Sequence, residues 1–289
     1  MAGFLFAIVA SVVFAIREGT NKKLTERMDV SVLVWASTLL SLVFFAIALA
    51  VEGMPEIEPS YWIIFPIAVA SATTTSVLLI RAIQCSPLSL TLPFLSFSPA
   101  FMIFTSYIML HELPNTWGII GIGCIVVGSY LINLEKTRQG FLAPLKAIWH
   151  ERGSFYALIV ALIWSVASNI DKMALERSSA FFYLLTVNIG VLIPLTAYVL
   201  YTRKRFVQQT KAHIGLLATV AALSSIGSTF QMLAIARILV PYVIAIKRGG
   251  TILGSIVLGK IFFHEKNIAY RLVGATAMII GIIFILAFH

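Results

Sequence analysis

Two adjacent basic residues, Lys247 and Arg248, are the residues of this sequence best suited to bind a charged ligand. They stand inside "PYVIAIKRGGTIL", in the middle of a run, 238–259, that holds no other charged residue and has the length of a membrane-spanning helix. A charge near the centre of a bilayer costs about 2.5–3.5 kcal/mol or more. Neighbouring residues on a helix project about 100° apart, so both side chains cannot reach one interface. We therefore expect the pair to face a water-filled cavity and to bind the anionic group of a substrate. The alternative is a structural ion pair with an acid such as Glu18 or Asp171.

A second set of polar and aromatic residues lies in other apolar segments and could shape the same cavity. Arg17 and Glu18, late in the first segment, and Asp171, in the sixth, could gate the cavity or relay protons, as carboxylates within membranes often do. They could equally lie at the interface and cap helix ends. The remaining candidates for substrate binding are single groups at depth, each of which could also simply pack or satisfy a backbone carbonyl: Tyr242, Asn169, Trp164, Thr74 and Gln231.

The composition of the chain is that of a polytopic membrane protein. Its 289 residues are 60% hydrophobic and 11% charged, with a mean hydropathy of +0.97, whereas soluble domains are roughly 45–50% apolar and about 25% charged. The net charge of +9 is scattered between apolar runs, which favours a lipid bilayer over nucleic acid as the partner. Cys85 and Cys124 show no metal-ligand or disulfide spacing, and no nucleotide-binding or nucleophile motif occurs. We expect neither an enzyme nor a bound metal or cofactor.

Polar joints divide the sequence into ten expected spans, and hence into an all-α protein. The longest joint, 135–153, carries charge, Gly and Pro and suits a linker between two halves, 1–134 and 154–289. Three prolines in "PLSLTLPFLSFSP" make a straight helix doubtful in the fourth span. The expected spans are 3–20, 30–51, 60–80, 87–110, 114–134, 154–173, 179–201, 213–236, 239–260 and 269–288.

The two halves resemble each other. At an offset of 150, "VASVVFAIREGTNKKLTER" lies on "VALIWSVASNIDKMALER", which pairs Phe14 with Trp164. At an offset of 153, "HE" at 111–112 lies on "HE" at 264–265, and the glycines 121 and 128 lie on 274 and 281. Because five spans are an odd number, the second copy must enter the membrane from the opposite face. The sequence therefore predicts an inverted repeat of five plus five helices, an arrangement found in secondary transporters.

These motifs resemble the ten-helix EamA-type permeases of the drug/metabolite transporter superfamily. The resemblance is carried by "FAIREGTNKKL" and "IWSVASNIDKMAL" at the start of each half, and by "LSFSPAFMIFTSYIMLHE" and "IKRGGTILGSIVLGKIFFHE" near each end. Phe14 stands where a Trp is usual in the family. The resemblance implies ten helices around a central cavity and transport by alternating access without ATP hydrolysis. The Lys247–Arg248 pair also resembles the arrangement in the organophosphate branch, and its counterparts in the first half, Phe94 and Leu95, are apolar.

The sequence thus predicts a secondary transporter of a small anionic metabolite, phosphorylated or carboxylated, in a plasma or inner membrane. Efflux of amino acids or amphipathic compounds is the alternative, and a lipid-phosphate enzyme within the membrane is a distant one. Coupling to protons or another ion stays open, as does the choice between monomer and homodimer. Orientation is also open: the basic joints lie on the face opposite the termini, which places the termini outside, whereas the resemblance places them in the cytoplasm.

Overall fold

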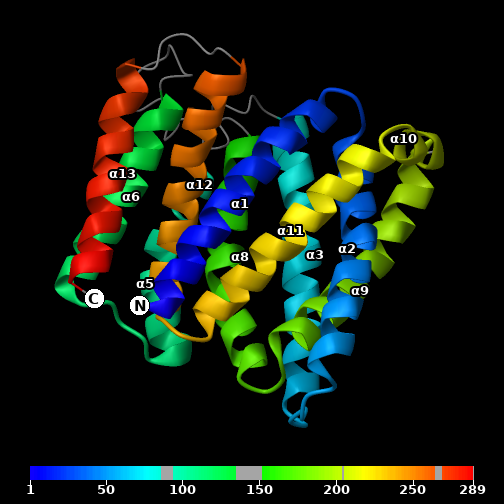
Figure 1. Ribbon diagram of the computed structural model, residues 1–289, viewed down its shortest axis with the longest axis horizontal. Helices are drawn as coiled ribbons and strands as arrows, with labels where there is room; N and C mark the ends of the chain where they lie inside the picture. The colour runs from blue at the N-terminus through cyan, green and yellow to red at the C-terminus, as the bar shows by residue number, and fades with distance from the viewer. Residues whose placement is uncertain (86–93, 135–151, 204, 264–268, 289) are drawn as a thin grey trace.

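A computed structural model describes residues 1–85, 94–134, 152–203, 205–263 and 269–288, and within these ranges all regular structure is helical (Figure 1). The expected linker 135–153 lies largely outside these ranges, and the prolines at 87 and 93 lie wholly outside them. The helices of the described ranges are α1 (Ala2–Thr25), α2 (Val30–Glu52), α3 (Tyr61–Cys85), α5 (Ser98–Leu110), α6 (Thr116–Leu134), α8 (Arg152–Leu175), α9 (Ala180–Thr202), α10 (Phe206–Ala212), α11 (Ile214–Ile235), α12 (Val240–Phe263) and α13 (Ala269–Ala287).

The protein is a polytopic membrane protein, as its composition predicts. In the described part of the chain, seven helices are long and apolar enough to cross a bilayer, namely α1, α2, α3, α8, α9, α11 and α12. The apolar helices α5, α6 and α13 are shorter over their described residues, so a total of ten spans stays a prediction. In α5, Pro99 occupies the first turn, where its missing N–H removes no helical hydrogen bond.

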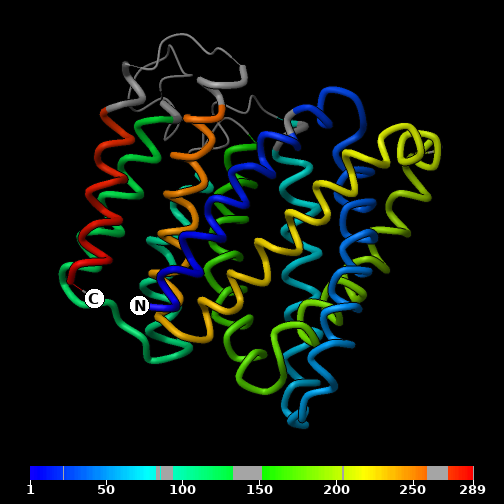
Figure 2. Tube along the Cα trace, viewed as in Figure 1, coloured from blue at the N-terminus to red at the C-terminus, as the bar shows by residue number. Residues whose placement is uncertain are grey.

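The helices pack so that elements paired by the repeat make similar contacts (Figure 1). The first helix of one half, α1, packs on α11 and α12, and its counterpart α8 packs on α3 and α5. The Cα trace in Figure 2 shows α1 and α11 running side by side across the bundle. The matched pairs α6–α13 and α2–α9 lie at opposite ends of the molecule. Helices of each half therefore pack against helices of the other half.

Glycines show the same symmetry at the level of single residues. A Cβ added to Gly121 would lie 2.7 Å from the carbonyl oxygen of Gly281, and one added to Gly128 would lie 2.4 Å from that of Gly274. The repeat pairs 121 with 274 and 128 with 281, so each glycine faces the counterpart of the other. The two helices approach closely because neither carries a side chain at these positions.

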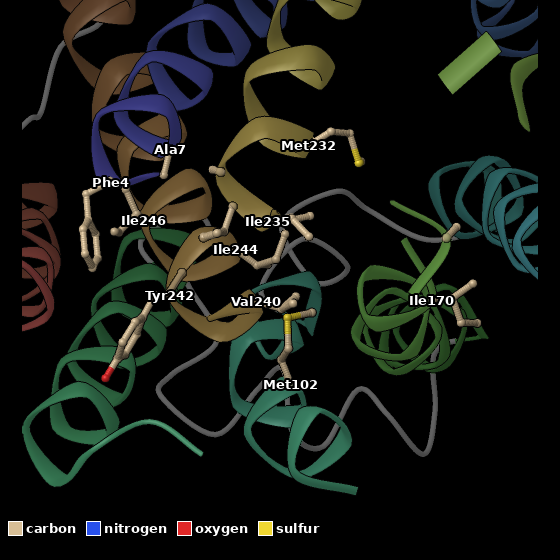
Figure 3. Close-up of a cluster of buried hydrophobic side chains, with 14 of the residues drawn as sticks. Phe4, Ala7, Met102, Ile170, Met232, Ile235, Val240, Tyr242, Ile244 and Ile246 are labelled. Atoms are coloured by element: carbon tan, nitrogen blue, oxygen red, sulfur yellow. The ribbon is translucent and has the colours of Figure 1, made fainter. Parts of the chain in front are cut away.

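The largest group of buried side chains among the described residues draws on all the long helices, and Figure 3 shows the part of it around α1, α5, α8, α11 and α12. It includes Tyr242 and Val240 near the start of α12 and Met102 in α5, all at most 4% exposed. Burial of these residues packs the helices against one another and places Tyr242 in the core.

Candidate substrate-binding cavity

A cavity of about 420 Å³ lies at the centre of the bundle, between α1, α3, α5, α8, α9, α11 and α12. Its size is within the range that holds small ligands, roughly 300–1,000 Å³. Helices of both halves contribute to it. The charged residues in its lining are Arg17, Glu18, Asp171, Lys247 and Arg248.

Lys247 and Arg248 both line the cavity and diverge from α12 toward different helices. The Lys247 ammonium donates to Oε1 of Gln231 at 2.8 Å and lies 5.5 Å from the centre of the Phe14 ring. The Arg248 guanidinium lies 4.9 Å from the centre of the Trp164 ring, a distance at which a cation is attracted to the ring face. Phe14 and Trp164 are the aromatic residues that the repeat pairs. Each of the two cations therefore lies against the same repeat position, Lys247 against that of the first half and Arg248 against that of the second.

No carboxylate among the described residues forms an ion pair with Lys247 or Arg248. Glu18 is paired with Arg17, its neighbour on α1, and Asp171 accepts a hydrogen bond from the Tyr183 hydroxyl. The Arg248 side chain donates only a long hydrogen bond, 3.4 Å, to Ser98, and its buried Nε has no partner within the described part of the protein. Asp171 and Glu18 nevertheless interact electrostatically with Lys247 and Arg248, respectively, without a direct contact. The structural ion pair considered for the sequence therefore stays an alternative.

Arg17 brings a third cation to the same part of the cavity. Its guanidinium lies 4.7 Å from the centre of the Phe14 ring, so Phe14 contacts both Arg17 and Lys247. The side chains of Arg17 and Glu18 are 28% and 42% exposed. This pair is therefore the more open of the charged groups that line the cavity.

Comparison with known proteins connects this cavity to transport. The sequence model of the EamA-like transporter family matches residues 1–134. The first half of the chain belongs to the EamA-like transporter family. A search of curated proteins gives no match. Among solved structures, a chain titled only as a crystal structure of a protein superimposes with a TM-score of 0.74 at 12% identity, covering 99% of this chain and 95% of that one; at this identity the likeness shows the fold alone.

The family match and the long apolar helices together indicate a multi-pass membrane transporter of the drug/metabolite type. The structure brings most of the residues singled out in its sequence into the cavity. These are Lys247, Arg248, Trp164, Gln231, Glu18, Arg17 and Asp171.

Three other candidates lie away from the cavity lining. Asn169 is fully buried and bonds to hydroxyls of α5, at 2.6 Å to Ser106 and 3.0 Å to Thr105. Tyr242 is buried in the core, and its hydroxyl accepts from the backbone N–H of Asn115 at 3.3 Å. Thr74 is exposed on the outer face of α3. In this structure Asn169 and Tyr242 join helices, and neither reaches the cavity.

Several cavity residues were not singled out in the sequence, chiefly Tyr183 and the hydroxyls of Ser98, Ser228 and Thr251. The repeat holds a signal for some of them. At the offset of 153, Ser98 corresponds to Thr251 and Thr75 corresponds to Ser228, and all four line the cavity. Hydroxyls retained at equivalent positions of both halves could therefore have pointed to these four residues.

Proposed function

We propose that this EamA-like transporter carries a small anionic metabolite, phosphorylated or carboxylated, and that Lys247 and Arg248 hold its anionic group. The observation that carries the proposal is the pair's environment. Both cations line the central cavity, their hydrogen bonds go to neutral groups, and among the described residues no carboxylate lies within ion-pair distance of them. Buried cations without a counter-ion are costly, and an anionic ligand supplies one. Guanidinium and ammonium groups are the usual partners of phosphate and carboxylate.

Alternating access is the proposed mechanism. Support comes from the pseudo-two-fold packing, in which α1 and α8 make equivalent contacts with the opposite halves. In such repeats, rocking one half against the other exposes a fixed midplane site to each side of the membrane in turn. We further propose that the protein works in a plasma or inner membrane, and that Glu18 or Asp171 carries the coupling proton if transport is proton-coupled.

The aromatic residues of the cavity offer less support to the alternative, efflux of amphipathic compounds. An apolar substrate would need free ring faces, but Lys247 and Arg17 contact Phe14, and Arg248 lies over Trp164. These cations leave less ring surface for an apolar substrate.

The test is a thermal-shift measurement on the purified full chain in detergent, with inorganic phosphate, phosphate esters and short carboxylates as ligands. A ligand at one hundred times its Kd stabilises the protein by about 2.7 kcal/mol. We expect anions to stabilise the wild type and to lose this effect in Lys247→Gln and Arg248→Gln. Lys211→Gln, an exposed lysine of α10, is the matched control and should respond as the wild type does. Stabilisation by cations alone, or by anions equally in all four proteins, would overturn the proposal.

A further inference from the structure

The short helix α10 lies at the outer edge of the bundle, where α9 ends and α11 begins (Figure 1). The helix before it, α9, has 23 residues, and at about 1.5 Å per residue it is about 35 Å long. The hydrocarbon core of a bilayer is about 30 Å thick. A helix of this length that begins at one interface ends at the other, so α10 lies at the level of the lipid headgroups.

One face of α10 is fixed to the rest of the protein. The Phe206 ring packs edge-on against the Trp35 ring, with 5.3 Å between the ring centres. Gln209 accepts a hydrogen bond from the backbone N–H of Asp29 at 3.1 Å and donates one to the Asp29 carboxylate at 3.0 Å. Arg203, just before α10, forms an ion pair with the same carboxylate at 3.3 Å. These contacts determine which face of α10 points away from the protein.

The opposite face of α10 is exposed and combines basic with apolar side chains. Arg205 and Lys211 are both exposed, and neither forms an ion pair with a described residue. One apolar side chain lies before α10, one within it and one after it: Tyr201 is 91% exposed, Val207 47% and Ile214 49%. These five residues are called the α10 surface below. Basic side chains beside exposed apolar and aromatic ones are typical of a membrane interface.

The corresponding joint of the first half has the opposite charge. The repeat relates the joint between α9 and α11 to that between α2 and α3, which holds Glu56 and Glu58 and no basic residue. This joint lies at the other end of the bundle, where Ser179 at the start of α9 donates to Glu52 at the end of α2. It also packs against its neighbouring joint, since Glu58 donates its backbone N–H to the Arg177 carbonyl at 3.0 Å. The scaffold thus accepts either sign of charge at this position, so the exposed cations of α10 are not required for packing.

We propose that the α10 surface binds anionic phospholipids, with Arg205 and Lys211 on the headgroup phosphates and the apolar side chains of the surface against the acyl chains. Guanidinium and ammonium groups form strong hydrogen bonds with phosphate. The exposed apolar side chains that border the two cations favour a lipid over a soluble phosphate compound. The site lies outside the central cavity and does not depend on the identity of the transported substrate. Binding of soluble anions in lipid-free detergent is therefore unaffected by Lys211→Gln.

The test is a titration of the purified full chain in detergent with dioleoyl phosphatidylglycerol, and separately with the zwitterionic dioleoyl phosphatidylcholine, followed by melting temperature. We expect phosphatidylglycerol to stabilise the wild type at a lower mole fraction than phosphatidylcholine. A basic residue near an anionic lipid surface changes the affinity about fivefold. The midpoint of the phosphatidylglycerol titration should therefore rise about fivefold in Arg205→Gln or Lys211→Gln, and about twenty-five-fold in the double variant. The phosphatidylcholine titration should stay unchanged, which shows that the variants are folded.

Arg237→Gln is the matched control. Arg237 is also exposed, but it lies in the joint between α11 and α12, where its guanidinium is 5.0 Å from the centre of the Phe6 ring. Its phosphatidylglycerol titration should match that of the wild type. An equal loss in Arg237→Gln would mean that any surface cation suffices, and equal stabilisation of the wild type by the two lipids would mean that charge is not recognised. Either result would overturn the inference.

Two further arms distinguish the α10 surface from other sites for a phosphate. If the preference for phosphatidylglycerol survives in the Arg205→Gln, Lys211→Gln double variant but is lost in Lys247→Gln and Arg248→Gln, the headgroup enters the cavity and the inference fails. Glycerol phosphate, at the same phosphate concentration, should give no shift that depends on Arg205 or Lys211. Such a shift would overturn the inference in favour of a soluble phosphate compound. None of these results bears on whether the cavity binds a soluble anion, so the proposed function is tested separately.

Discussion

The α6–α13 contact and the central cavity are both built from the duplicated sequence, but they use the duplication differently. In the contact, Gly121 and Gly128 face Gly281 and Gly274, so matched positions hold the same residue. In the cavity, Lys247 and Arg248 correspond to Phe94 and Leu95, which are 0% and 7% exposed, and Asp171 corresponds to Asn21. The positions that stay alike hold the two halves together. The positions that differ carry the charges that a ligand would meet.

The largest effect is expected at an ion pair that belongs to the shared scaffold. Glu112, duplicated as Glu265, pairs with Lys172 where both side chains are largely buried, 13% and 16% exposed, and it also accepts from the N–H of Val240 at 3.2 Å. Glu112→Ala leaves a buried charge unpaired, so it should lower the free energy of unfolding by about 3–5 kcal/mol. Thermal denaturation in detergent measures this.

The matched control for that pair is Glu58→Ala. Glu58 lies 3.9 Å from Arg177 and is 62% exposed, and exposed pairs contribute roughly 0–1 kcal/mol. Equal destabilisation by the two variants would contradict the assignment of Glu112 to the scaffold, as would a loss of phosphate affinity in folded Glu112→Ala protein.

The glycine contact should give the next largest effect. In Gly128→Ala the added Cβ would meet the Gly274 carbonyl at 2.4 Å, and backbone cannot yield as a flexible side chain does, so we expect a loss of about 2–3 kcal/mol. In Gly123→Ala on the same helix the Cβ meets nothing within 4 Å, and the substitution should be neutral or stabilise the helix by about 0.5–1 kcal/mol. Melting temperatures that move in the same direction in Gly128→Ala and Gly123→Ala would contradict the distinction between a packed and an open glycine.

Phe14 belongs to the cavity side of the comparison, because its ring contacts both Arg17 and Lys247. Phe14→Leu removes this contact, and at about 1 kcal/mol for a partly desolvated cation–π interaction it should weaken phosphate binding about fivefold. The control is Phe6→Leu, since Phe6 contacts Arg237 and does not line the cavity. Calorimetric titration should show unchanged affinity there; a similar loss in both variants would mean that the effect is not local.

The smallest effect is expected at Ser98, which accepts a hydrogen bond from Arg248 at 3.4 Å. So long a bond contributes little, and Ser98→Ala should weaken phosphate binding less than about threefold. Its repeat counterpart, Thr251, donates instead to the carbonyl of Ser11 at 3.3 Å, so Thr251→Val should leave phosphate affinity unchanged in the same titration. A larger loss of phosphate affinity in Thr251→Val than in Ser98→Ala would mean that Thr251, and not Ser98, supports the anion site.

Much of the fold follows from hydropathy, because a bilayer demands long apolar helices. The spans expected at 30–51, 179–201 and 213–236 differ by one residue at each end or less from α2, α9 and α11. The short helix α10 was not predicted, since its seven residues lie in a basic joint without an apolar run. The packing of α1 on α11 and of α8 on α3 depends on contacts between halves that hydropathy does not contain.

The cavity was predictable where charge in an apolar run is costly, as at Lys247 and Arg248. It was less predictable where the direction in which a side chain points from its helix decides whether it lines the cavity. Thr74 and its neighbour Thr75 are alike in sequence, but Thr75 lines the cavity and Thr74 is exposed outside it. Asn169 has the polarity of a binding residue, yet Ser106 and Thr105 of α5 satisfy it. These two partners lie on a neighbouring helix, so the sequence around Asn169 does not identify them.

Counterflow in proteoliposomes tests the central claim, transport of an anion held by Lys247 and Arg248, most directly. Vesicles that contain the purified chain are loaded with unlabelled phosphate esters and carboxylates, and uptake of the labelled compound is followed against empty vesicles. We predict exchange of at least one anion by the wild type and by Lys211→Gln, and its loss in the double variant Lys247→Gln, Arg248→Gln. Exchange that persists unchanged in the double variant, or that is confined to cationic and neutral compounds, would contradict the account.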